Sequence, residues 1–233
     1  MQRSCRIESL QKSRMNVEQM HPIWKAWLSH ALSSNQWKCL LENIERIEKQ
    51  GTVVYPAEDQ RLRVFSLNPK EIQVVILGIE PYHQTNTSDG LAFSVLPLGK
   101  ITPALKCIDH ALAYDVQAPL NGNFDLSRWS AQGVFLLNRA LTVAGGMPRS
   151  HAQLGHEWFT DAVISALSKN CHSLTFMLWG SSSIQKRALI DQRHCILEST
   201  YPSSETWKVF AESRPFSRAN AQLLRIGKKS IIW

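Results

Sequence analysis

The sequence predicts a single α/β domain built around a parallel sheet. Four short apolar runs, rich in β-branched residues, lie at residues 72–77, 134–137, 174–178 and 195–197. Continuous apolar runs of this length are typical of strands that are buried on both faces. Helical patterns lie between the runs, and this alternation indicates a doubly wound fold. A chain of 233 residues suits one such domain with a sizeable core.

The predicted helices cover residues 22–32, 36–50, 102–114, 158–167 and 182–190. The first places Trp24, Trp27 and Leu28 on one face, as expected of an amphipathic helix. The third begins with Thr102-Pro103, a favourable helix start because proline fits the first turn.

The chain divides into two parts. Residues 1–20 are polar and mixed in charge, and we expect a flexible N-terminal segment there. Residues 21–233 form the predicted domain. The sequence has no apolar run of 18 residues, so it predicts no transmembrane helix, and its N-terminus lacks the apolar region of a secretory signal.

The composition favours a nucleic-acid partner. Apolar residues make up 44% and charged residues 19% of the chain, and the net charge is +7. A basic surface attracts polyanions. The five cysteines are odd in number and widely spaced, with no C-x-x-C pair. This pattern argues against a zinc site or a disulfide framework and fits a reducing compartment.

Polar residues follow the predicted strands, where ligands gather in parallel sheets. Glu80 lies on a Gly/Pro turn, and Asn138 ends the second strand. The Asn138 amide offers a donor and an acceptor that match the edge of a pyrimidine, and Tyr82 and Phe93 suit the walls of a flat site. Taken singly, these residues also suit a solvent-exposed turn, a helix cap or a core position.

Three serines, Ser94, Ser181 and Ser203, are candidates for phosphate binding. The alternative is that they cap helices. The combination counts for more than its members, because four strand ends carry compatible chemistry.

Six motifs in order resemble those of the family 1 uracil-DNA glycosylases. The chain has GIEPYH at 78–83, GLAFSV at 90–95, FLLNRALTV at 135–143, SHAQLGH at 150–156, FMLWGS at 176–181 and YPSSET at 201–206. The family patterns are G-Q-D-P-Y-H, G-L-[AC]-F-S-V, L-L-L-N-x-x-L-T-V, S-H-x-x-L-G-W, F-L-L-W-G-S and H-P-S-P-L-S. The similarity extends from about Thr52 to Trp233.

The resemblance implies one domain with a central four-stranded parallel sheet flanked by helices. It also implies a monofunctional enzyme that flips uracil out of single- or double-stranded DNA and cleaves its N-glycosidic bond with water, with neither metal nor cofactor. A proteinaceous glycosylase inhibitor is a candidate partner, and we expect a monomer. The expected location is the cytoplasm in a bacterium, and the nucleus or a host-cell compartment if the source is eukaryotic or viral.

At two positions that are catalytic in the family, this chain has a different residue. Glu80 replaces the catalytic aspartate, which orients water and stabilises the cationic sugar. Tyr201 replaces the histidine that donates a hydrogen bond to the leaving uracil. We therefore expect Glu80 and Tyr201 to be the catalytic pair.

The resemblance assigns the remaining positions to uracil or to DNA. The uracil-binding residues it implies are Ile79, which replaces a glutamine, and Tyr82, Phe93 and Asn138. The DNA-binding residues it implies are His83, Ser94, Pro103, Ser181, Ser203 and Glu205. In the family, a leucine that wedges into the DNA stack stands at position 205, and the loop around Pro103 reads P-P-S instead of Thr102-Pro103-Ala104.

Three functions remain open from the sequence. The first is an active but attenuated uracil-DNA glycosylase, since losing a transition-state donor costs about 10²–10³-fold. The second is a non-enzymatic DNA-binding or accessory relative, motivated by Tyr201 and Glu205. The third is a glycosylase for another modified base, against which the retained Tyr82 and Asn138 argue.

Overall fold

The structure is a computed structural model that describes residues 15–97 and 99–233. Its α-helices are α2 (Pro22–Trp27), α3 (Ser29–Ser33), α4 (Asn35–Lys49), α5 (Pro103–Val116), α6 (Ser127–Ser130), α7 (His156–Asn170), α8 (Ser181–Ile184), α9 (Trp207–Glu212) and α10 (Pro215–Arg225). The strands are β1 (Val54–Tyr55), β2 (Val74–Gly78), β3 (Val134–Asn138), β4 (Val143–Ala144), β5 (Thr175–Trp179) and β6 (Cys195–Ser199). Short 3₁₀ helices are η1 (Val17–Gln19), η2 (Glu58–Gln60), η3 (Arg63–Ser66), η4 (Pro69–Glu71) and η5 (Gln185–Leu189).

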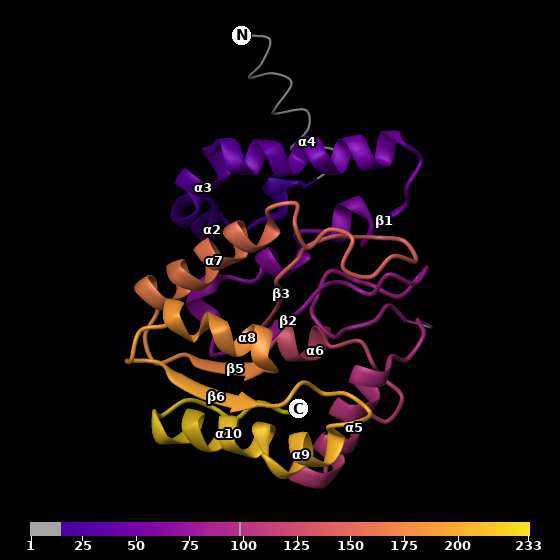
Figure 1. The fold of residues 1–233 in the computed structure, drawn as a ribbon. Coiled ribbons are helices and arrows are strands. Elements are labelled where there is room, and N and C mark those ends of the chain that lie inside the picture. Colours follow the sequence, from indigo (N-terminus) through magenta and orange to yellow (C-terminus); the bar gives the residue numbers. More distant parts are fainter. Residues whose placement is uncertain (1–14, 98) are drawn as a thin grey trace.

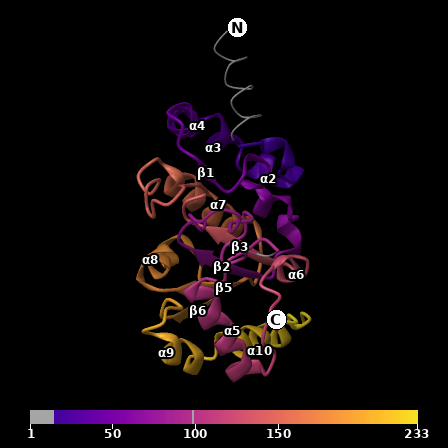
Figure 2. The ribbon, with the colours of Figure 1, turned by 90° about the vertical axis from the view of Figure 1, so that its right-hand side faces the viewer.

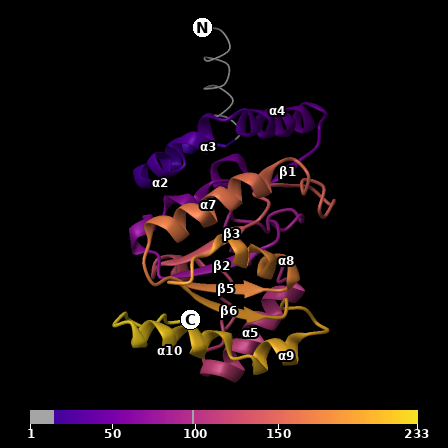
Figure 3. The same cartoon turned by 60° about the vertical axis from the view of Figure 1, so that its left-hand side comes forward.

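The central sheet has four parallel strands in the order β3-β2-β5-β6, which confirms the predicted fold class. Figures 1 and 3 place the sheet in the middle of the molecule, with α2, α3, α4 and α7 on one side and α5, α9 and α10 on the other. The quarter turn in Figure 2 keeps the same three levels. β1 and β4 form a separate antiparallel pair.

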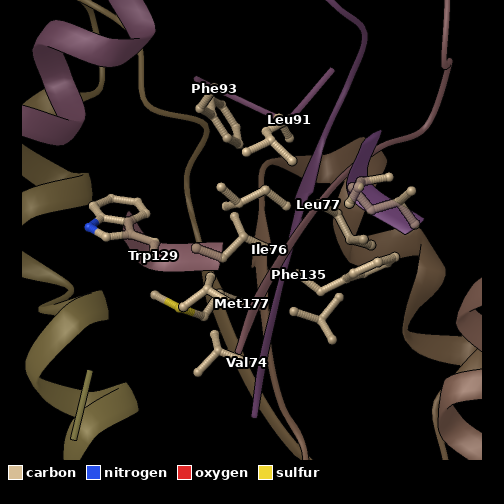
Figure 4. Close-up of a cluster of buried hydrophobic side chains, with 14 of the residues drawn as sticks. Val74, Ile76, Leu77, Leu91, Phe93, Trp129, Phe135 and Met177 are labelled. Carbon is tan, nitrogen blue, oxygen red and sulfur yellow. The ribbon is translucent and has the colours of Figure 1, made fainter. Parts of the chain in front are cut away.

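Strands β2, β3 and β5 form the centre of the core. Every residue of β2, β3 and β5 is buried, as their apolar runs predict. Successive side chains of a strand point to opposite faces, and Figure 4 shows Ile76 on the side of Trp129 and Leu77 on the side of Phe135.

β6 corrects the prediction of burial on both faces. Cys195 and Ile196 are only half-buried, and Glu198 is exposed. Edge position alone is not the reason, because β3 is the other edge strand and stays buried, with Phe135 packed against Trp24 and Phe65. On β6 the exposed Glu198 instead pairs with Arg187 at the surface, so part of one face of this strand lies in solvent.

Several helices also differ from the sequence prediction. The segment predicted as one helix over residues 22–32 is two short helices that meet at Leu28, and residues 182–190 divide between α8 and η5. The C-terminal helices α9 and α10 were not predicted. Most of the expected flexible segment, residues 1–14, lies outside the described residues. In the rest of that segment Met15 and Met20 pack into the core.

The strand order places a ligand site between β2 and β5. From β2 the chain continues to β3 on one side, and from β5 it continues to β6 on the other. Ligands bind at the carboxyl ends of the strands where the direction of connection reverses in this way. In Figure 3, α8 lies at the arrowhead end of β5. No helix in the described ranges is both long and apolar enough to span a bilayer.

Candidate active site

A cleft of about 780 Å³ opens at this reversal point. It is lined by residues 79–84, 100–104, 148–149, 180–182 and 201–204. Eight of the twelve predicted site residues line it, and they are Ile79, Glu80, Tyr82, His83, Pro103, Ser181, Tyr201 and Ser203. Segments far apart in the sequence therefore meet in one cleft.

The Glu80 carboxylate is held by the backbone of the loop that contains Arg149. The Arg149 N–H donates to both Glu80 oxygens, each at 2.9 Å. Arg149 has φ 61°, a left-handed conformation that is uncommon for a residue with a side chain. The carboxylate is therefore oriented in the cleft by a hydrogen bond that needs no particular side chain.

Tyr201 lines the same cleft, where burial and the charge of the Glu80 carboxylate shift the pKa of its hydroxyl. Burial raises the pKa of the Tyr201 hydroxyl, and the nearby Glu80 carboxylate raises it further. Both effects disfavour the phenolate. The Tyr201 hydroxyl therefore keeps its proton at neutral pH and is a hydrogen-bond donor.

Asn138 and Phe93 are not among the residues that line the cleft. Asn138 pairs with Gly78 across β3 and β2 and is 6% exposed. Its amide makes no hydrogen bond within the described ranges. The Phe93 ring lies 6.3 Å from the Tyr201 ring. The Asn138 amide is therefore available as a donor and acceptor beside Gly78, the residue that precedes Ile79 of the cleft lining.

A hydrogen-bonded pair fixes Tyr82 against the start of α5. The Thr102 hydroxyl donates to the Tyr82 hydroxyl at 3.0 Å, and Tyr82 donates to the Phe93 carbonyl at 3.1 Å. Thr102 also accepts from the Leu105 N–H as the N-cap of α5. Burial raises the Tyr82 pKa, so its side chain is neutral. The two hydrogen bonds fix that side chain in the lining of the cleft.

Ser94 does not reach the cleft. It is fully buried, and its hydroxyl donates to Asp89 at 2.6 Å and accepts from the Leu126 N–H at 3.0 Å. Both functions of the hydroxyl are therefore used inside the protein. The Ser94 side chain in this structure therefore belongs to the core of the 89–94 turn, and its expected contact with a DNA phosphate stays a prediction.

Glu205 and Ser203 lie on the loop between β6 and α9. Glu205 is exposed and does not line the cleft. Thr206 donates to the Tyr201 carbonyl, so the 2.9 Å hydrogen bond between Ser203 and Thr206 uses the Ser203 proton. Ser203 therefore keeps acceptor capacity but has no free hydroxyl proton.

Two buried histidines anchor the loop that holds Glu80. The Thr142 hydroxyl lies 2.8 Å from His151 Nδ1 and 2.8 Å from His156 Nε2. Since this hydroxyl has one proton, it donates to one ring and accepts from the other. Burial lowers the pKa of His151 to about 4 and that of His156 to about 3, so both rings are neutral.

Sequence reasoning missed Arg149 as part of the site. Its contribution is a backbone N–H, which every residue except proline carries, and Glu80 lies 69 positions away in the chain. Residue type therefore carries no signal for this contact. The only hint is that Arg149 directly precedes the SHAQLGH segment.

Comparison with solved structures defines the class of the fold. A mimivirus uracil-DNA glycosylase aligns with a TM-score of 0.87 at 23% identity, covering 97% of this chain and 92% of that one. A mimivirus UNG variant in complex with UGI aligns with a TM-score of 0.88, also at 23% identity, covering 97% of this chain and 94% of that one. The UNG of Nitratifractor salsuginis aligns with a TM-score of 0.58 at 16% identity, covering 89% of this chain and 96% of that one. The chain therefore has the uracil-DNA glycosylase fold.

Sequence comparison establishes the family. The chain is 38% identical over 221 residues to the uracil-DNA glycosylase of Campylobacter concisus, covering 94% of this chain and 96% of that protein. It is 37% identical over 223 residues to that of Campylobacter lari, with the same coverage. No model of a protein family matches the chain. The chain belongs to the uracil-DNA glycosylase family, which confirms the resemblance predicted from its motifs.

Proposed function

We propose that the protein hydrolyses the N-glycosidic bond of deoxyuridine in DNA, with Glu80 and Tyr201 as its catalytic pair. One observation carries the assignment of the pair: both residues line one cleft, with Glu80 oriented by the Arg149 N–H. In this reaction positive charge develops on the sugar and negative charge on the departing uracil. A fixed carboxylate and a protonated phenol match these two charges.

Uracil recognition is proposed for Ile79 and Tyr82, which line the cleft, and for Phe93 and Asn138, which do not. The Asn138 amide binds the Watson–Crick edge, since it has both a donor and an acceptor. The Phe93 ring stacks on the base, and the Ile79 N–H supplies a backbone contact. Tyr82, held by Thr102 and by the Phe93 carbonyl, crowds the C5 position and so excludes thymine.

We propose that the DNA backbone is gripped at the rim of the cleft. His83, Pro103, Ser181 and Ser203 all line it, and Ser203 must turn its hydroxyl proton away from Thr206 to donate to a phosphate. Such contacts position the strand without reading its sequence. The exposed carboxylate of Glu205 is a poor wedge for the base stack and repels phosphate. We therefore propose slow base flipping and an attenuated rate.

The test is a single-turnover assay of uracil release from single-stranded DNA. The wild type should release uracil, and Glu80→Gln, which keeps the shape but removes the charge, should slow release about 10²–10³-fold. Asn138→Ala is the control for base recognition, and Glu58→Gln is a control for charge outside the cleft. No release by excess wild-type enzyme over hours would reject the enzymatic function.

A second candidate is a DNA-binding accessory protein without turnover. Glu205, the charged residue at the wedge position, is the observation that favours it. It predicts uracil-DNA binding with no release. A panel of modified-base oligonucleotides in the same assay tests the remaining candidate, a glycosylase for another base.

We also propose a protein inhibitor as a partner, and a cellular location for the protein. The likeness to a mimivirus UNG variant in complex with UGI supports a proteinaceous inhibitor of that kind as a partner, and titration of UGI into the release assay tests it. Bacterial relatives and the free thiols of Cys39, Cys107, Cys171 and Cys195 support a bacterial cytoplasm. We also propose that the protein is a monomer, which size-exclusion chromatography tests.

A further inference from the structure

A second concavity, of about 890 Å³, lies beside the cleft between α5 and the start of α9. We refer to it as the α5–α9 groove. Its lining consists of Pro103, Lys106, Cys107, His110, Ala113, Tyr114, Ser204 and Trp207. Six of these residues follow helical spacing along α5, so the groove is one face of that helix opposed by the start of α9. Figure 2 shows α5 and α9 at the same end of the molecule.

The groove is continuous with the catalytic cleft. Pro103 lines both, and so does Ser204. The shared rim offers a path on one side for the nucleotides next to a uracil in the cleft. The groove is therefore within reach of a nucleotide that flanks the uracil.

The groove has exposed aromatic side chains. Tyr114 is 56% exposed and Trp207 is 37% exposed. The His110 ring meets the Trp207 ring edge-on at 6.0 Å. Exposed aromatic faces of this kind stack on unpaired bases without regard to sequence.

The charge of the groove complements a nucleic-acid strand. Lys106 lines it, and Lys208 Nζ lies 5.8 Å from the centre of the Trp207 ring. Neither lysine forms an ion pair with the residues that the structure describes. None of the described lining residues carries a carboxylate. Asp109, Asp115 and Glu205 each adjoin a lining residue along the chain, but Asp109 accepts the Leu120 N–H and Asp115 caps α10. Aromatic surface flanked by unpaired cations is the combination that binds single strands.

We propose that the α5–α9 groove binds a nucleobase of the single strand next to the uracil, stacked on Trp207, with Lys106 against the adjoining phosphate. The proposal rests on the uracil-DNA activity proposed above. Binding in the α5–α9 groove contributes affinity for DNA that does not depend on residue 205, the wedge position, where this chain has Glu205.

The experiment compares oligonucleotides that carry one uracil and zero to six nucleotides on its 5′ or its 3′ side. Affinity is measured by fluorescence anisotropy at early times, and uracil release is measured separately. For the wild type, extension on one side should tighten binding about tenfold, the scale of one stacked base. Trp207→Ala should lose this gain, yet bind the unextended oligonucleotide as the wild type does.

Matched variants separate stacking from folding. Trp207→Phe should restore most of the gain, because it keeps an aromatic face. Val209→Ala alters an exposed apolar residue of the same helix outside the groove and should leave the gain unchanged. Lys106→Ala should weaken the salt dependence of the gain.

The outcomes distinguish this proposal from the proposed function. A one-sided gain that Trp207→Ala abolishes, without uracil release, supports the groove and rejects the enzyme. Uracil release with a gain that survives Trp207→Ala rejects the groove and keeps the enzyme. Absence of any extension effect, or a groove covered by a second copy or by a peptide, also overturns the groove proposal.

Discussion

Glu80 carries the family carboxylate on a side chain that is one methylene longer than aspartate. The longer side chain reaches the loop of Arg149, where both carboxylate oxygens accept the Arg149 N–H at 2.9 Å. The loop of Arg149 is therefore placed for glutamate. Position and side-chain length are matched within this chain, whatever the family pattern has at this position.

Restoring the aspartate should lower the rate. Glu80→Asp withdraws the carboxylate from Arg149, and a displacement of about 1 Å costs on the order of 10²-fold. The measurement is single-turnover uracil release, with DNA affinity as the control for an intact cleft. A variant faster than the wild type would show that Glu80 is a defect and not an adjusted catalytic group.

Gly78 is required because the Asn138 amide occupies the space of its missing side chain. A Cβ at position 78 would lie 2.2 Å from Asn138 Oδ1 and 2.9 Å from the Ala92 Cβ. We expect Gly78→Ala to push the amide aside and slow uracil release by about 10²-fold. Gly122→Ala, where no atom lies within 4 Å, is the control, although its φ of 81° adds local strain. Equal rates for the two variants would contradict the assigned role of Asn138.

At the scale of elements, the loop that orients Glu80 depends on the pair His151 and His156. Both rings are buried and neutral because burial lowers their pKa from 6.5 to about 4 and about 3. As pH falls, the two histidines therefore bind protons at a higher pH in the unfolded chain than in the folded one. The contribution of the pair to stability is complete above pH 6.5 and is lost as pH falls toward 4.

His156→Gln should flatten this acid dependence. Glutamine keeps a hydrogen-bonding group for Thr142 but does not titrate. The free energy of unfolding, measured in urea between pH 7 and about 4, should fall less steeply than in the wild type. His172→Gln, at an exposed position, should leave the slope unchanged. An unchanged slope in His156→Gln would mean that other groups control acid stability.

α10 receives its N-terminal cap from another helix. Its own N-cap residue, Arg214, makes no side-chain cap. Instead Asp115, near the end of α5, accepts the Phe216 and Ser217 N–H groups, each at 2.9 Å. The carboxylate also lies at the positive end of the helix dipole. This contact ties α10, which covers β5 and β6, to the helix that lines the cleft.

Removing this cap should destabilise the protein by about 1–2 kcal/mol, the cost of losing an N-cap. Asp115→Ala is the test, and Asp115→Asn should recover part of the loss because its amide oxygen still accepts. The free energy of unfolding is measured in urea. Asp59→Ala, at an exposed position, is the control, and an equal effect there would contradict the capping role.

At the scale of the whole molecule, the net charge of +7 produces a long-range electrostatic attraction to DNA. Cations that neutralise phosphates release counterions, so affinity falls with salt. The Glu205 carboxylate opposes this attraction near the cleft. Long-range attraction and local repulsion therefore act together on the approach of the strand.

DNA affinity should fall about tenfold or more between about 50 and about 200 mM salt. Glu205→Gln should raise affinity at low salt, and the difference from the wild type should shrink as salt screens it. Fluorescence anisotropy with one single-stranded uracil oligonucleotide measures both. An affinity independent of salt would exclude phosphate contacts as the main source of binding.

The sequence by itself determined the class of the fold, the three fully buried strands and the chemistry available at their ends. Continuous apolar runs predict β2, β3 and β5 because burial on both faces leaves no room for polar residues. The identities of Glu80, Tyr201 and Asn138 are likewise visible in the chain. These features are local, so a short stretch of sequence contains them.

Only the tertiary structure decided how these groups are used. It made β6 an edge strand, buried the Ser94 hydroxyl against Asp89, joined Glu80 to Arg149 and supplied the α10 cap from Asp115. The last two contacts join positions 69 and 101 residues apart. Each depends on a backbone N–H, which is chemically the same at almost every position, so folding alone selects the partner.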